Sequence, residues 1–168
     1  MSEENNENYQ QQTPKQFILF TLVVALVASS ATWLSLTLNL EVWIMFAGFI
    51  AWFTGPASLR DGLTALICFY LGMFLAVVAS AATGSLIPYL GSLALPTVVF
   101  FVASLIVGLR TISYVNNMLG WFLGMVTFYA SHLGASVESF QILIGASVIG
   151  GLAGWLIQTI NRRLVLSN

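Results

Sequence analysis

The sequence predicts an all-α membrane protein with six transmembrane helices and both termini in the cytoplasm. Of its 168 residues, 58% are hydrophobic and only 7% are charged, whereas soluble domains carry about 25% charged residues. The mean hydropathy is +0.92. A soluble globule of this size lacks the interior to bury so much apolar surface, and the apolar runs have the length of membrane helices.

The predicted organisation has three parts: a disordered polar tail at 1–14, a single six-span domain at 15–163 and a short tail at 164–168. The first tail holds three Glu, three Asn and three Gln, too polar to fold alone. Thr13 and Pro14 suit an N-cap and a first helical position. A cleaved signal peptide is the alternative interpretation of residues 15–31, but the preceding segment is acidic and the apolar run continues to Leu38.

The first two apolar runs differ in length. Phe17–Leu36 gives twenty uncharged, mostly apolar residues, enough for one crossing. Trp43–Pro56 reads WIMFAGFIAWFTGP and stops after fourteen residues. As a helix it would reach roughly 21 Å, against a bilayer core of about 30 Å. It is therefore either a short crossing, a re-entrant loop or a buried helix, and extension through Ala57–Leu59 would lengthen it.

The remaining runs predict four more helices. Gly62–Leu109 carries no charge over forty-eight residues, too long for one crossing, and GSLIPYLGS (Gly84–Ser92) with its proline supplies a turn. Thr111–Val137 has its apolar centre at Met118–Leu133, and Ser139–Asn161 is the last uncharged run. The expected spans lie near 17–36, 43–59, 62–83, 93–109, 117–133 and 139–160.

The charges favour six crossings. If all six runs cross, one side of the membrane holds every basic residue: Lys15, Arg60, Arg110, Arg162 and Arg163. The other side then holds Glu41 and Glu138 and no Lys or Arg. Cytoplasmic loops are enriched in Lys and Arg, so both termini are expected in the cytoplasm. Making the two short segments re-entrant would divide the basic residues three against two.

Small residues suggest two inverted three-helix repeats. Gly48 and Gly120 open the two short segments, seventy-two residues apart. Ladders of small residues follow in the third and sixth segments at an offset of seventy-four, and Gly124 completes a GxxxG pair. The residues expected in helix packing are Gly72, Ala76, Ser80, Gly84, Gly120, Gly124, Ala146, Gly150 and Gly154. Such ladders let helices approach closely in lipid, and an odd number of spans per repeat requires inversion.

No Asp, Glu, Lys or Arg falls within an apolar core, which disfavours a proton-coupled pump, a voltage sensor or a carrier of charged substrates. Neutral polar and aromatic groups are the candidates for lining a solute path: Trp52, Thr54, Asn116, Asn117, Trp121, Thr127, Tyr129 and His132. Such groups can replace the hydration of a neutral solute, although packing within the bundle is the alternative for each. His132 is either an entrance gate or an interfacial residue.

Several classes of function are not expected. Cys68 is the only cysteine, so no internal disulfide forms, and no metal or other cofactor is expected. Phosphate loops, HExxH, nucleophile elbows and paired carboxylates are absent from the sequence, which disfavours an enzyme. The net charge of −1 gives no case for nucleic acid. We expect a passive channel or facilitator for a small neutral solute, homo-oligomeric in the lipid bilayer; the alternative is a non-transporting membrane assembly protein.

The stretch WLSLTLNLEVWIMFAGFIAWFTGPASLRDGL (Trp33–Leu63) resembles the signature region of the YcdZ-like proteins, a group of small bacterial inner-membrane proteins with a domain of unknown function. The matching elements are Trp33, Trp43, Gly48-Phe49, Trp52-Phe53 and Gly55–Gly62. A second stretch, NNMLGWFLGMVTFYASHLG (Asn116–Gly134), resembles the later half of the family. The resemblance implies a multi-span protein of the bacterial inner membrane. It brings no activity and no catalytic residues, and the acidic head and short C-terminal tail depart from it.

Overall fold

The computed structural model describes residues 14–55 and 58–166, and these residues form helices and no strands. The predicted N-cap Thr13 and nearly all of the predicted N-terminal tail lie outside them. The elements are α2 (Pro14–Thr37), α3 (Val42–Trp52), α4 (Leu59–Leu90), the 3-10 helix η1 (Gly91–Leu93), α5 (Ala94–Leu109), α6 (Met118–Ala130) and α7 (Val137–Leu166).

Three helical stretches are long and apolar enough to cross a membrane: Pro14–Thr37, Leu59–Leu109 and Val137–Arg163. The second of these contains both α4 and α5 and the sharp turn between them. Two further apolar helices are short, with 11 residues in α3 and 13 in α6. The prediction of an all-helical membrane protein is confirmed at this level.

The second predicted segment, 43–59, is too long. Helix α3 ends at Trp52, where the backbone N–H of Phe53 bonds to Ile50 O at 2.9 Å and turns the chain. The next helix starts anew after Ser58, whose hydroxyl caps α4. The expected helical extension through Leu59 is therefore wrong, and α3 is shorter than the sequence suggested.

The turn predicted at 84–92 is also misplaced. Helix α4 continues to Leu90 and contains both Gly84 and Pro88. A proline close to the C-terminal end of a helix removes only one hydrogen bond, and α4 continues two residues beyond Pro88. The helix ends instead at Gly91, whose φ of 53° suits glycine, as is common after a C-terminus.

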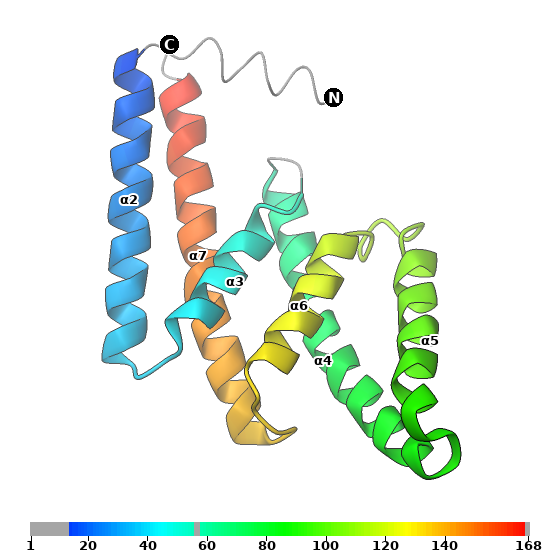
Figure 1. Ribbon diagram of the computed structural model, residues 1–168. Coiled ribbons are helices and arrows are strands. Elements are labelled where there is room, and N and C mark those ends of the chain that lie inside the picture. The colour runs from blue at the N-terminus through cyan, green and yellow to red at the C-terminus, as the bar shows by residue number, and fades with distance from the viewer. Residues whose placement is uncertain (1–13, 56–57, 167–168) are drawn as a thin grey trace.

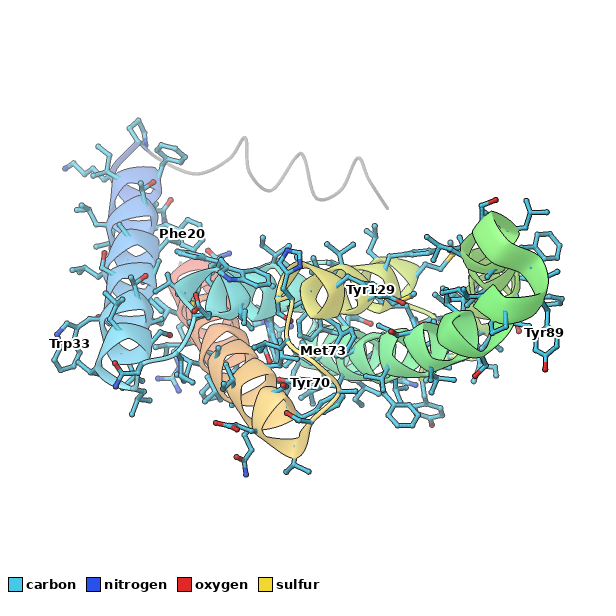
Figure 2. All side chains as sticks on the ribbon, turned by 60° about the horizontal axis from the view of Figure 1, so that its bottom comes forward. Phe20, Trp33, Tyr70, Met73, Tyr89 and Tyr129 are labelled. Carbon is cyan, nitrogen blue, oxygen red and sulfur yellow. The ribbon has the colours of Figure 1, made fainter. Side chains whose placement is uncertain are left out.

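The helices form an elongated array (Figure 1). Helices α2 and α5 stand at its two ends, α7 packs beside α2, α4 packs beside α5, and the short α3 and α6 lie between them. Successive helices run in alternate directions, so that α2 begins and α7 ends on the same side. Figure 2 shows Tyr70 and Met73 in the middle of this array and Trp33 and Tyr89 projecting from its periphery.

Two helix pairs are joined by direct backbone contact. An ideal Cβ built on Gly150 of α7 would lie 1.8 Å from Met45 O of α3, and one on Gly48 of α3 would lie 2.1 Å from Ser147 O of α7. The pair α4–α6 repeats this arrangement, because Gly72 approaches Trp121 O and Gly124 approaches Phe69 O. We call α3–α7 and α4–α6 the two locked pairs. Only glycine permits such an approach, as expected for helices associating in lipid.

The other predicted packing residues divide into two groups. Ala76 and Ala146 are fully buried, Gly120 lies against Ala65 O, and Gly154 lies against Trp52. The predicted small residues nearer the C-terminus of α4 do not pack closely. Ser80 is exposed, and a Cβ on Gly84 would meet nothing within 4 Å, so neither position makes a close helix contact among the residues that the structure describes.

Candidate functional site

A polar cleft of about 440 Å³ opens at the side of the molecule where α2 begins and α7 ends. It is formed where α3 ends, α4 and α6 begin and α5 gives way to the following loop. The lining residues are Thr54, Gly55, Asp61, Thr64, Arg110, Asn116, Asn117, Met118 and Leu119. The cleft therefore combines chain segments that are far apart in sequence.

Asn117 is the central side chain of the cleft. As the N-cap of α6 its Oδ1 accepts a hydrogen bond from Gly120 N at 2.7 Å, which satisfies a free N–H of the first turn. Its Nδ2 donates to Thr54 Oγ1 at 2.9 Å, and Thr54 in turn donates to Ala51 O at 2.8 Å. One amide thus starts α6 and connects it to the end of α3.

The α4 side of the cleft is held by a second cap. Ser58 Oγ accepts from Asp61 N at 3.0 Å and donates to the Asp61 carboxylate. A carboxylate in the first turn also interacts favourably with the helix dipole. Gly55 lies close by, because a Cβ there would stand 3.2 Å from Asp61 Cβ. These contacts fix the carboxylate at the wall of the cleft.

The two arginines near the cleft have different positions. Arg110 contributes to the lining and supplies its positive charge. Arg60 lies over the ring of Tyr114, with its guanidinium carbon 5.4 Å from the ring centroid, a favourable cation–π contact. The lining therefore carries one carboxylate and one guanidinium of opposite charge, and its other polar groups are hydroxyls and amides.

Three of the predicted path residues, Thr54, Asn116 and Asn117, line the cleft. Two others pack inside the bundle. Trp121 donates from Nε1 to Val115 O at 2.9 Å, and Thr127 bonds within its own helix to Leu123 O at 2.8 Å. Both side chains are at least nine-tenths buried, so they lie in the packed interior rather than on the cleft wall.

Trp52 is also a packing residue. Its indole Nε1 donates to Gln158 Oε1 of α7 at 2.9 Å. Ideal Cβ atoms on Gly62 of α4 and Gly154 of α7 would lie 2.6 Å and 2.8 Å from Trp52 atoms, so the side chain fills the space that both glycines leave. Trp52 is only 3% exposed and fixes the end of α3 between two other helices.

Tyr129 and His132 lie at the opposite end of α6 from the cleft. Tyr129 OH donates to Ala76 O of α4 at 3.1 Å. His132 has a φ of 53° just after the helix, and its backbone N–H bonds to Tyr129 O at 3.3 Å. This left-handed residue ends α6, a position where non-glycine residues are uncommon.

Sequence reasoning missed Asp61, Thr64 and Arg110 as cleft residues. A signal for Asp61 was available, because Ser58 and Asp61 have the spacing of a helix cap. Arg110 was used only to assign the sides of the membrane. In the described part of the chain, no group of three or more His, Cys, Asp or Glu residues is placed to hold a metal ion.

Replacing Asn117 with alanine should destabilise the protein by about 1 kcal/mol, the usual cost of losing an N-cap, and should leave Thr54 Oγ1 without its donor. Asn116→Ala is the matched control, because that neighbouring side chain is exposed and caps no helix. Unfolding of both variants in mixed micelles, followed by circular dichroism, measures the difference. Equal stabilities for the two variants would contradict the capping role.

These features define a helical membrane protein that carries a polar cleft at one side. The model of the family described as "Protein of unknown function (DUF1097)" matches residues 21–161. The chain belongs to that family. Searches of curated proteins and of solved structures gave no match.

Proposed function

We propose that the protein is a facilitator that carries a small neutral polar solute across the bacterial inner membrane, entering or leaving through the cleft. The proposal rests chiefly on the composition of the cleft wall. Thr54, Thr64, Asn116 and Asn117 offer hydroxyls and amides to a solute that must give up its hydration. The charges of Asp61 and Arg110 balance, so the site favours no net charge.

Six crossings with both termini cytoplasmic fit the alternating directions of the helices. Lys15 lies in the first turn of α2, Arg60 begins α4, Arg110 follows α5, and Arg162 and Arg163 lie near the end of α7. All these positions belong to one side of the array, whereas α3 and α7 begin on the other side after Glu41 and beside Glu138. By the positive-inside rule the cleft would face the cytoplasm.

Matching contacts support two inverted repeats, α2–α4 and α5–α7. In the short helices the N-caps Glu41 and Asn117 lie 76 residues apart, as do Gly48 and Gly124 with their equivalent backbone contacts. In the long helices Gly72 and Gly150 lie 78 apart, again with equivalent contacts. This pairing differs from the offsets of seventy-two and seventy-four that sequence likeness suggested.

The helix starts extend the same correspondence. Ser58 accepts from Asp61 N, and Ser136, which is 78 residues further along, accepts from Ser139 N at 3.1 Å ahead of α7. Inverted repeats with short helices in matching places are typical of transporters. The short α3 and α6 would then be the helices beside the solute path.

Stopped-flow swelling of proteoliposomes with urea, glycerol, short amides and ammonia tests the function. We expect at least one of them to enter faster than into empty liposomes. In a Cys68→Ala background, coupling a bulky maleimide to Asn116→Cys should block the flux by filling the cleft. The same label on Ser113→Cys, an exposed position of the same loop that does not line the cleft, should leave it unchanged. Absence of flux for every solute would exclude the facilitator.

The alternative, a non-transporting assembly protein, has less support. An assembly protein needs a free partner surface, and two of the predicted small packing residues, Gly150 and Gly154, are covered by α3. A homo-oligomer stays part of the proposal, because a bundle in which α3 and α6 have only 11 and 13 residues is thin. Native mass spectrometry in gentle detergents measures the number of copies, and a monomer throughout would remove the oligomer.

A further inference from the structure

Apolar side chains pack together at the end of the molecule opposite the cleft. Phe128 at the end of α6 stacks on Phe140 of α7, with ring centroids 6.3 Å apart and planes at 25°. Leu40 and Leu133, from the two loops at this end, pack against the same buried cluster. We call Leu40, Phe128, Leu133 and Phe140 the apolar plug.

The two ends are built from corresponding positions with different side chains. The offset of 78 pairs Phe140 in the plug with Gly62. The offset of 76 pairs Leu40 in the plug with Asn116 at the cleft. The cleft residues have polar counterparts at the plugged end as well. Asn117 corresponds to Glu41, Gly55 to Ser131 and Asp61 to Ser139. Polar groups therefore exist at both ends, and the cleft described above lies at the end without the plug.

The contacts within and between the locked pairs differ in kind. Within each pair, glycines bring one backbone against another, which leaves little freedom for sliding. Between the pairs, the contacts run through side chains. Two hydrogen bonds join them, Asn117 Nδ2 to Thr54 Oγ1 at 2.9 Å beside the cleft and Ser147 Oγ to Tyr70 OH at 3.4 Å in the middle. Trp52 of α3 packs on Gly62 of α4, and one buried apolar cluster includes residues of all four helices. Movement of one pair against the other as rigid bodies would keep the backbone contacts within each pair and would repack these side chains.

We infer that this structure is one of two alternating states. Rocking of α3–α7 against α4–α6 would close the cleft, separate the apolar plug and open a second mouth lined by Glu41, Ser131 and Ser139. The solute would meet carboxylate and hydroxyl groups there in place of amides. This inference rests on the proposed function for its purpose, and it assigns a carrier mechanism rather than an open pore.

Reactivity of a buried cysteine tests the second mouth without any transported solute. Ser139 is only 7% exposed, so Ser139→Cys in a Cys68→Ala background should react slowly with a maleimide. Lipid nanodiscs give the reagent access to both sides. Removing the stacked ring with Phe140→Ala should raise the rate about tenfold by shifting the population toward the second state. The control is Phe100→Ala, at a ring that is 67% exposed on α5, and it should leave the rate unchanged.

A wedge in the cleft provides the decisive comparison. A bulky maleimide placed first on Asn116→Cys should hold the cleft open and lower the rate at Ser139→Cys about tenfold, even in the presence of the plug. The same wedge on Ser113→Cys should have no effect. Equal reaction rates at Ser139→Cys with both wedges would overturn the alternation. This comparison keeps Phe140, so it holds even if the Phe140→Ala variant fails to fold. Solute flux together with equal maleimide rates for the two wedges would support the facilitator and exclude the alternation. Unequal rates without any solute flux would support the alternation and exclude the facilitator.

Discussion

Replacing Gly150 with alanine is expected to destabilise the folded protein by on the order of 3 kcal/mol, the upper range for overpacking a tight interior. The added methyl carbon would lie 1.8 Å from Met45 O and 2.6 Å from Phe49 N. Both atoms are backbone, so no side chain can rotate away. Helix α7 would have to move off α3 and lose the packing of Met45, which is completely buried.

Gly84→Ala is the matched control for that variant. Gly84 lies inside α4, and a Cβ there meets nothing within 4 Å. Alanine exceeds glycine in helix propensity by about 1 kcal/mol, so this variant should be unchanged or slightly more stable. Unfolding in mixed micelles, monitored by circular dichroism, compares the two. A Gly150→Ala protein as stable as Gly84→Ala would contradict the close approach of α3 and α7.

Replacing Trp52 with alanine should cost about 3–5 kcal/mol, the range for removing a buried aromatic side chain. The indole fills the space beside Gly62 and Gly154, and no neighbouring side chain at these glycines can expand into it. Its removal also leaves Gln158 Oε1 without the indole donor. The end of α3 should loosen, and the wall of the cleft at Thr54 should loosen with it.

Trp155→Ala separates this effect from a general loss of tryptophan. Trp155 is 41% exposed on the same helix as Gln158, so its removal should cost much less. Trp52→Phe keeps most of the ring and should lose about 1–3 kcal/mol, largely the penalty of the unpaired Gln158 oxygen. Denaturant titration should find Trp52→Ala the least stable of the three variants. A Trp52→Ala variant no weaker than Trp155→Ala would exclude the packing role.

The helices were largely predictable from the sequence because apolar runs and charges mark them strongly. The ends of the helices were harder to predict from the sequence. Pro88 was expected to break α4, but its place two residues before the end of the helix let the helix absorb it. The short second segment was predicted too long, because nothing in WIMFAGFIAWFTGP distinguishes Phe53 and Thr54 from helical residues.

The cleft was only partly predictable, because it depends on the meeting of separate segments. Thr54 and Asn117 were chosen for their neutral polar groups, but their hydrogen bond joins positions 63 residues apart, and no local pattern encodes it. Asp61 was not among the candidate residues, and Arg110 was used only to assign the sides of the membrane. The glycines were recognised as packing residues, but their partners were not, since a small residue indicates a close approach without indicating what approaches.

The pairing of α3 with α7 has a consequence for how the protein is made. Residues 53–136 separate the end of α3 from the start of α7. A ribosome adding about 5–20 residues per second needs roughly 4–17 s to synthesise that stretch. Throughout this interval the glycine face of α3 has no α7 to cover it. An 11-residue helix is too short to rest stably in the bilayer alone. Insertion of α3 should therefore be completed late, when the final helix emerges, and the newborn chain is the form most exposed to quality-control proteases.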